Sequence, residues 1–238
     1  MSDRLKSFLF AALLCVISSV LLTAASTGLQ DVQQKNMLVD KQKNILKSVG
    51  LIRVGEDYSG KEIETLFSTH IRSLWVDSTG RLVEQDRRSE RDIPLYVRME
   101  NNAIRAYIVP IDSKGLWGRI QGYLAIENDG STVAGFTVFK HSETPGLGGE
   151  IEKEWFQKNW VGKKIVDRNG NFVSIGIVRG AVQDVIPVDK QANYVDGISG
   201  ATLTGKYLSA GLGEVLKTYE PAAIRFRKNL AAGPGREG

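Results

Sequence analysis

The chain has 238 residues, of which 42% are hydrophobic and 24% charged, so it is long and apolar enough to bury the core of one sizeable domain plus an appendage. The formal net charge is +4, but basic and acidic side chains alternate, as in residues 84–92, and this mixed surface argues against a nucleic-acid-binding protein. Cys15 is the only cysteine, which excludes an internal disulfide and a thiolate metal cluster.

An uncharged, apolar segment lies near the N-terminus, at residues 7–30. About 20 apolar residues cross the hydrocarbon layer of a membrane, so this segment is predicted to be a single transmembrane helix that follows a short segment at 1–6. A cleaved secretory signal is the alternative, because Arg4 and Lys6 precede the run and small residues occupy 24–26. The length of the apolar run favours an uncleaved anchor.

The basic residues that flank this segment give a weak signal for its orientation. Those after the segment outnumber those before it, and charge alone would place the C-terminal side in the cytoplasm. Long domains are translocated largely regardless of their charge, so this count has little weight.

Residues 31–230 are predicted to form one soluble domain. Spaced apolar side chains over 32–51 predict that the first helix continues out of the membrane, and a second helix is predicted over 61–74. Apolar or alternating segments separated by short turns then predict four strands in antiparallel hairpins, at 95–99, 104–109, 120–126 and 133–139.

The rest of the domain is predicted to contain helices and one more strand. A helix is predicted over 150–160, a strand over 172–178 and a final helix from near Thr202 to Leu216. The predicted fold class is therefore α+β, with an antiparallel sheet and flanking helices. The tail at 231–238 is predicted to be disordered.

The most informative segment is 196–206, which reads DGISGATLTGK. Gly200 and the later Gly-Lys pair have the spacing of a phosphate-binding loop, but Tyr207 stands where that loop requires a Ser or Thr hydroxyl for Mg²⁺, so nucleoside triphosphate hydrolysis is rejected. The final helix begins near Thr202 and Thr204, where free N–H groups favour a phosphate. Capping of that helix by one of the two threonines is the simpler alternative.

A second segment, 141–150, contains three glycines around Pro145. Such a loop is open and fixed, and its backbone can approach a planar ligand closely, although an ordinary turn before the next helix is the alternative. The spacing of His141, Glu143 and Glu150 is not that of a helical zinc pair, so no metal site is predicted.

Two residues elsewhere are candidates to contact the same ligand. Trp117 lies between Gly115 and Gly118 and could pack against a ring, with core burial as the alternative. Arg179 is predicted on a loop after a strand, where it could hold polar groups of a ligand or form part of a surface turn.

Residues 196–202 resemble the flavinylation motif of the FMN-binding-domain family, in which an aspartate leads a Ser/Thr-Gly-Ala-Thr element. This resemblance implies that a flavin transferase joins the phosphate of FMN to the last threonine of the element, Thr202, with Thr204 as the first alternative acceptor. The segment 143–148 resembles the part of the same family that lies against the isoalloxazine ring. The cofactor-binding residues implied in this way, with the two candidates above, are Thr202, Ser199, Gly200, Ala201, Thr204, Asp196, Glu143, Thr144, Gly146, Leu147, Gly148, Trp117 and Arg179.

Segments at 28–46, 115–118 and 160–164 narrow the resemblance to the C-subunit family of bacterial sodium-translocating NADH:quinone oxidoreductases. This resemblance implies an electron-relay subunit with covalent FMN, in a complex of integral membrane subunits that oxidises NADH, reduces ubiquinone and exports Na⁺. It places the flavin domain on the periplasmic side of the inner membrane, and the flavin, not an acid or base of the protein, carries the chemistry. The alternatives are the G subunit of the ferredoxin-linked Rnf complex and a non-catalytic, membrane-anchored flavin-binding domain.

Overall fold

The computed structural model describes residues 2–53 and 55–231, and the chain divides into two compact units after Asp40. The first unit consists of the N-terminal part of helix α1, Asp3–Ser48. The second unit begins with the last turns of the same helix and contains all the other described helices and strands.

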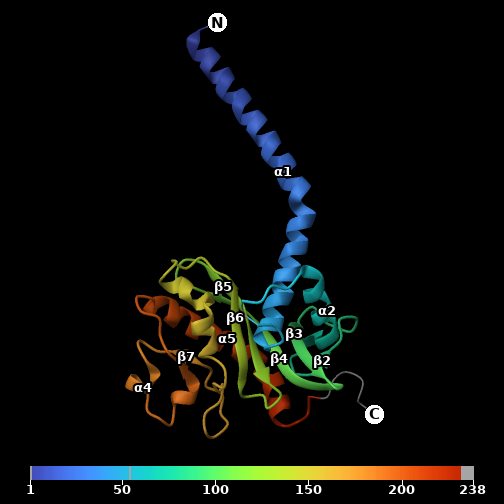
Figure 1. Cartoon of the computed structure of the whole chain (residues 1–238), viewed down its shortest axis with the longest axis vertical. Coiled ribbons are helices and arrows are strands. Elements are labelled where there is room, and N and C mark those ends of the chain that lie inside the picture. Colours follow the sequence, from blue (N-terminus) through green and yellow to red (C-terminus); the bar gives the residue numbers. More distant parts are fainter. Residues whose placement is uncertain (1, 54, 232–238) are drawn as a thin grey trace. The chain divides into compact units, whose positions relative to one another are not determined.

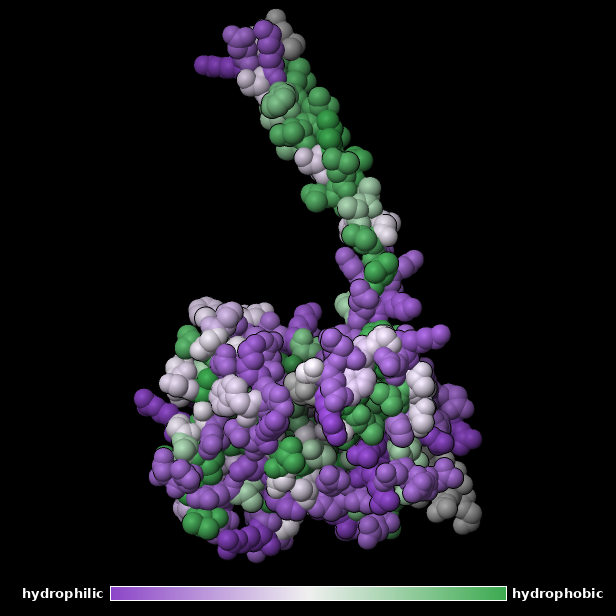
Figure 2. All heavy atoms as spheres, viewed as in Figure 1, coloured by the Kyte–Doolittle hydropathy of each residue, from purple (hydrophilic) through white to green (hydrophobic). Residues whose placement is uncertain are grey.

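Helix α1 is apolar over most of its length in the first unit. Its large side chains there are exposed, among them Phe8 at 70% and Leu22 at 71%, and apolar residues dominate the visible face of this part of the helix (Figure 2). Among the described residues it is the one helix long and apolar enough to cross a membrane. The predicted transmembrane segment and its predicted continuation therefore form one helix. It ends at Ser48 because Gly50 has a left-handed φ of 68° and its N–H bonds back to the Lys47 carbonyl.

The second unit is built on a six-stranded antiparallel sheet with the strand order β2-β1-β3-β4-β5-β6 (Figure 1). The strands are β1 Ile71–Val76, β2 Leu82–Val83, β3 Ile93–Glu100, β4 Ala103–Lys114, β5 Arg119–Glu127 and β6 Val133–Lys140. The four predicted strands correspond to β3 to β6, and the predicted α+β class with an antiparallel sheet is confirmed. Between β3 and β4, Asn101 and Asn102 both have positive φ, as a tight hairpin turn requires.

Helices cover both faces of the sheet, which is why its central strands are apolar on both sides. One face packs against α5, Thr202–Arg227, for example through the stacked rings of Tyr107 and Phe226, whose centroids lie 4.4 Å apart. The end of α1 and helix α2, Gly60–His70, pack on the opposite face. There the Thr137 hydroxyl donates a hydrogen bond to the Asn44 carbonyl of α1.

Helix α2 is shorter than predicted. It begins with a capping box in which the side chains of Ser59 and Glu62 each accept a hydrogen bond from the other's backbone N–H. It ends at His70, so the predicted end at residue 74 was wrong. Ile71 and Leu74 belong to β1 instead, where they pair with β3 and are only 5% and 2% exposed. Strand pairing with a distant segment outweighs the helical spacing of these side chains.

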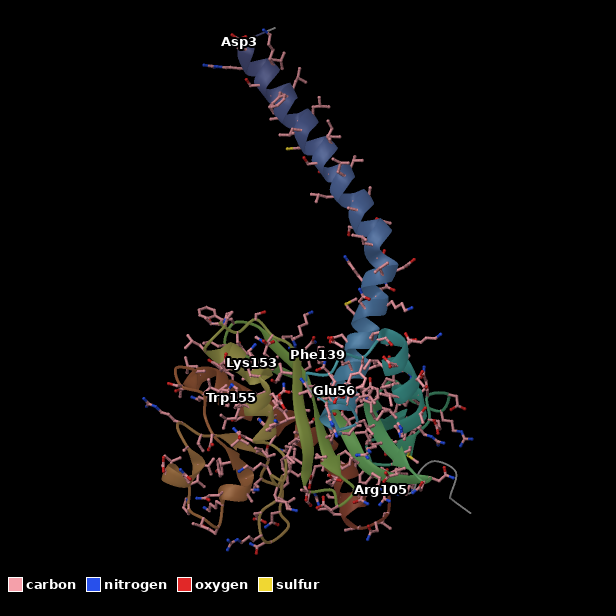
Figure 3. The ribbon with its side chains drawn as sticks, viewed as in Figure 1. Asp3, Glu56, Arg105, Phe139, Lys153 and Trp155 are labelled. Atoms are coloured by element: carbon pink, nitrogen blue, oxygen red, sulfur yellow. The ribbon has the colours of Figure 1, made fainter. Side chains whose placement is uncertain are left out.

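Between β6 and α5 the chain forms short elements, which are η1 Gly148–Glu152, α3 Glu154–Lys158, β7 Gly176–Ile177, α4 Val182–Val185, η2 Gln191–Asn193 and β8 Tyr194–Val195. The predicted single helix over 150–160 was wrong, since the extended backbone of Lys153, labelled in Figure 3, separates η1 from α3. The predicted strand over 172–178 is reduced to β7, because Ser174 has a left-handed φ of 64°. β7 pairs in parallel with β8.

Helix α5 begins at Thr202, as predicted, but continues beyond the predicted end at Leu216 to Arg227. It continues because its buried face does, through side chains such as Tyr219 and Phe226. Of the tail that was predicted to be disordered, Ala231 packs partly against the core. The remainder of that prediction, 232–238, lies outside the described residues.

Candidate functional site

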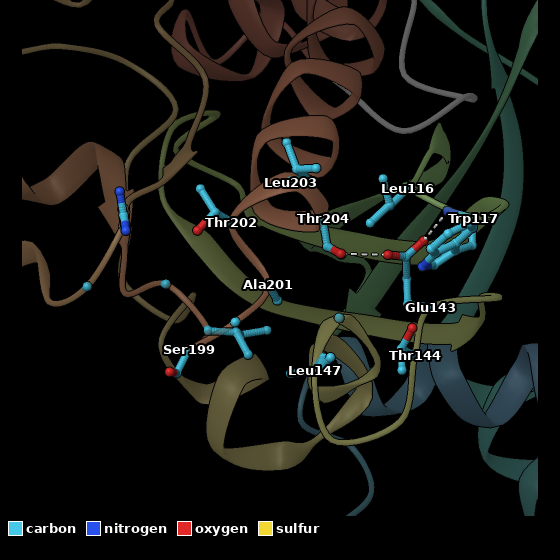
Figure 4. A pocket seen from close by; sticks show the side chains of 16 residues that line it. Leu116, Trp117, Glu143, Thr144, Leu147, Ser199, Ala201, Thr202, Leu203 and Thr204 are labelled. Atoms are coloured by element: carbon cyan, nitrogen blue, oxygen red, sulfur yellow. Dashed lines mark hydrogen bonds between the residues drawn. The ribbon is translucent and has the colours of Figure 1, made fainter.

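A pocket of about 680 Å³ lies where several loops meet the first turn of α5 (Figure 4). One loop joins β4 to β5, another follows β6, a third follows β7, and the segment after β8 leads into the helix. The lining residues are Leu116, Trp117, Glu143, Thr144, Leu147, Gly148, Arg179, Gly180, Gly197, Ile198, Ser199, Gly200, Ala201, Thr202, Leu203 and Thr204. The structure therefore brings together all of the predicted site residues except Asp196 and Gly146.

The first turn of α5 presents an open helix N-terminus to this pocket. Thr202 is the first residue of the helix and is exposed, and the N-cap residue is Ala201, which has no side chain able to accept a hydrogen bond. Helix capping by Thr202 or Thr204, the simpler interpretation of the sequence, is therefore wrong. The unsatisfied N–H groups and the positive end of the helix dipole face a space where an anion can bind.

Thr204 differs sharply from Thr202, although only one residue separates them. The Thr204 side chain is 2% exposed, and its hydroxyl donates a 2.6 Å hydrogen bond to Oε2 of Glu143. Glu143 is itself only 4% exposed, and its Oε1 accepts a 3.1 Å hydrogen bond from the backbone N–H of Trp117. Both contacts are drawn in Figure 4. A buried carboxylate thus connects the β4–β5 turn to the first turn of α5.

Glycines allow the loops to approach this carboxylate. A Cβ on Gly115 would lie 2.5 Å from Oε1 of Glu143, and a Cβ on Gly148 would lie 2.4 Å from the Thr204 hydroxyl oxygen. No side chain fits at either position without displacing the buried pair.

His141 supports the turn that carries Glu143. The backbone N–H of Glu143 donates to Nδ1 of His141 at 3.1 Å, so the neutral ring has its proton on Nε2 and donates it to Glu152, 3.2 Å away. Hydrogen bonds from Lys153 and then from His141 hold the pKa of Glu152 below its usual value.

Asp196 and Gly146 do not line the pocket. Oδ1 of Asp196 accepts a 2.7 Å hydrogen bond from the backbone N–H of Val182, which ties the segment before α5 to the start of α4. Gly146 has a left-handed φ of 75° and forms the turn of the loop after β6. Both residues therefore shape the loops that line the pocket.

The sequence motifs did not single out several lining residues as ligand contacts, namely Leu116, Gly197, Ile198 and Leu203. For Leu203, the helical spacing of apolar residues in the sequence could have indicated a ligand contact. The buried stripe of α5 runs through Leu208, Leu212 and Leu216, and counting back by fours reaches Thr204, which leaves Leu203 outside the stripe. An apolar residue outside the buried face of an amphipathic helix is a candidate for ligand contact.

Three apolar side chains at the pocket remain substantially exposed, which are those of Trp117 at 69%, Leu203 at 50% and Leu147 at 43%. Trp117 is not buried in the core, so that alternative was wrong. A pocket with an open helix N-terminus at one place and exposed apolar side chains at others suits a ligand that has both an anionic and a flat apolar part.

Residues 115–217 match the protein family described as the FMN-binding domain. The chain is 34% identical to the C subunit of the Na(+)-translocating NADH-quinone reductase of Pseudomonas aeruginosa, in an alignment that covers 84% of this chain and 87% of that protein. It is also 34% identical to the C subunit of the same enzyme from Yersinia pestis, over 92% of this chain and 94% of that protein.

A solved structure agrees with these sequence relationships. The crystal structure of the C subunit of the Na(+)-translocating NADH-quinone reductase from Parabacteroides distasonis superposes with a TM-score of 0.69 at 31% identity, over 82% of this chain and 96% of that one. The chain therefore belongs to the C-subunit family of the Na(+)-translocating NADH-quinone reductases.

Proposed function

We propose that this chain carries FMN joined through its phosphate to the hydroxyl of Thr202 and relays electrons within a Na⁺-translocating NADH:quinone reductase. The observation that carries the proposal is the position of Thr202, an exposed hydroxyl at the open N-terminus of α5, on the wall of a pocket of about 680 Å³. The family membership and the FMN-binding-domain match support the identity of the cofactor.

The residues present fit FMN. Pockets for small ligands typically measure about 300–1,000 Å³, and this one lies within that range. The uncapped start of α5 can bind the phosphate, Trp117 and Leu147 offer apolar surface to the ring, and Arg179 can hold its polar groups. When bound, FMN supplies one-electron transfer, and this chain would supply tethering and orientation.

Thr202 is a better acceptor than Thr204 for a structural reason. A transferase must reach the acceptor oxygen. Thr202 is exposed, whereas Thr204 is 2% exposed and its hydroxyl donates a hydrogen bond to Glu143. In the attachment step, the Thr202 oxygen forms a bond to phosphorus while the bond from phosphorus to an activating group, such as the AMP half of a flavin dinucleotide, breaks. The hydroxyl proton passes to a base of the transferase.

The relay function requires a fixed position in the membrane complex. A covalently attached carrier does not dissociate, and the apolar α1 would anchor the domain beside other integral membrane subunits. We place the flavin domain on the periplasmic side, with the complex reducing ubiquinone and exporting Na⁺. Flavin chemistry needs no acid or base from the chain, so no catalytic residue is assigned.

The attachment is tested by co-expressing the full chain with a flavin transferase, denaturing it, and recording in-gel flavin fluorescence and peptide masses. The wild type and Thr218→Ala, a control at an exposed threonine of the same helix, should carry one FMN, and Thr202→Ala should carry none. A flavin-free wild type, with the transferase shown active on another substrate, would refute covalent attachment.

Membership of the complex and orientation need separate measurements. A tag on the chain should co-purify other integral membrane subunits together with NADH-dependent quinone reductase activity. Protease added to intact spheroplasts should digest the second unit if it lies outside the cytoplasmic membrane, and digestion only after lysis would contradict the periplasmic placement.

A further inference from the structure

The burial of Glu143 and its two hydrogen bonds in the site are not explained by a flavin that contacts only loop backbone and apolar side chains. Its carboxylate is 4% exposed and uses both oxygens, one on the Thr204 hydroxyl at 2.6 Å and one on the Trp117 N–H at 3.1 Å. The two partners lie 61 and 26 residues away in the chain, so the side chain connects segments that meet only in the folded domain.

The three connected segments are three walls of the pocket. Trp117 belongs to the β4–β5 turn, and Glu143 lies in the loop between β6 and η1. Thr204 lies in the first turn of α5, two residues after Thr202. Trp117 has a side chain that is 69% exposed, and its backbone is held by this carboxylate. Displacing Glu143 would therefore free the Trp117 turn to move relative to the helix that presents Thr202.

We propose that Glu143 is the positioning residue of the flavin site, whose carboxylate holds the Trp117 turn and the first turn of α5 at the spacing that orients the ring of a flavin tethered on Thr202. The inference builds on the proposed function, because it assigns a role to Glu143 only in a chain that carries FMN. Glu143 acts through Trp117 and Thr204 and does not itself react.

The donors and acceptors of Glu143 and its two partners predict which substitutions preserve the hydrogen bonds to Thr204 and Trp117. In Glu143→Gln, the amide oxygen can accept from the Trp117 N–H and the amide nitrogen can donate to the Thr204 oxygen, so the geometry is retained without the charge. Thr204→Ser likewise retains the hydroxyl. Glu143→Ala removes both contacts, and Thr204→Val removes one and leaves a buried carboxylate oxygen without its donor.

The test uses the full chain in detergent, first without flavin and then flavinylated on Thr202, with attachment verified by peptide mass. Amide hydrogen exchange at Trp117 reports the contact in the flavin-free chain. Flavin fluorescence and visible circular dichroism report how firmly the ring is held in the loaded chain. The control is Glu150→Ala, which removes another carboxylate from the same region. The Glu150 carboxylate accepts a hydrogen bond from the Trp155 ring N–H, and Glu150 does not line the pocket.

Glu143→Ala should accelerate exchange at Trp117 by roughly tenfold or more, as expected for loss of a hydrogen bond to a charged group. Its attached flavin should become more fluorescent and lose most of its visible circular dichroism, while Glu143→Gln, Thr204→Ser and Glu150→Ala stay close to wild type. If Glu143→Ala is not recovered folded, Thr204→Val should show the same changes in flavin fluorescence and visible circular dichroism, because it removes the hydrogen bond between α5 and Glu143.

The inference is overturned if flavin attached to Glu143→Ala or Thr204→Val has wild-type spectra, or if Glu143→Gln changes them as much as Glu143→Ala does. Either result would leave the attachment to Thr202 standing. A wild-type chain without covalent flavin would instead refute the proposed function and, with it, this role of Glu143.

Discussion

Gly200 lies directly against Leu147, so close that a Cβ on Gly200 would come within 2.7 Å of Cδ2 of the leucine. This contact joins the two segments that carry the flavin resemblance, one in the loop after β6 and the other at the start of α5. Gly200 also has a left-handed φ of 75°, a conformation that costs other residues about 1–2 kcal/mol.

We expect Gly200→Ala to lose about 1–2 kcal/mol of unfolding free energy and also to bind flavin less well, because Leu147 must move away from the pocket wall. The matched control is Gly170→Ala, where φ is 81° but nothing lies within 4 Å of the added Cβ. Both variants should unfold earlier in denaturant, and only Gly200→Ala should reduce the flavin content. Equal flavin content in the two variants would contradict a role for the Gly200–Leu147 contact.

Asp196 should support the site without touching it. Asp196→Ala removes the acceptor for the Val182 N–H, a loss of about 1–3 kcal/mol for a hydrogen bond to a carboxylate, and loosens the segment before α5. Asp196→Asn keeps an acceptor oxygen. We expect the alanine variant to carry clearly less covalent flavin than the asparagine variant under the same transferase treatment, measured by peptide mass. Full loading of Asp196→Ala would show that the Val182 contact is dispensable.

Truncations should separate the anchor from the flavin domain. Removal of residues 1–40 should release a soluble chain that keeps its thermal stability, because the two compact units divide after Asp40. Removal of 1–48 also deletes Ile45 and Leu46, which are 1% and 0% exposed, at a cost of about 3–6 kcal/mol. The checks are the membrane fraction and the thermal unfolding midpoint. Equal midpoints for the two truncations would contradict packing of the end of α1 in the domain core.

Acid should remove a contribution of Asp129 to stability. Partial burial raises its pKa, but hydrogen bonds from Thr132 and Ser131 and the charge of Lys164 outweigh this effect, and the net pKa lies below its usual value of 3.8. A depressed pKa stabilises the folded chain above the unfolded-state value, and the contribution is lost as the pH falls through the folded-state value.

Asp129→Asn should therefore lower the thermal unfolding midpoint at pH 7, and the difference from wild type should shrink as the pH falls below 3.8. The exposed Asp189→Asn serves as the control and should match wild type at each pH. A difference that stays constant down to the lowest pH would argue against a depressed pKa at Asp129.

Much of the fold could be predicted because its signals are local. The uncharged run at 7–30 indicates the apolar helix, and apolar segments between short turns indicate β3 to β6, since strand period and turn chemistry depend on neighbouring residues. The elements that were missed depend on distant partners. Ile71 fits both a helical and a strand pattern, and only its pairing with Arg98 of β3 selects the strand.

The candidate site shows the same division. By itself the sequence determined that two glycine-containing segments, at 143–148 and 196–202, resemble one flavin-binding family, and that two threonines stand near a helix start. Only the tertiary structure distinguished those threonines, because the buried face of α5 turns Thr204 toward Glu143 and leaves Thr202 exposed at the pocket. A contact across 61 residues leaves no local pattern, since the chain folding back on itself creates it.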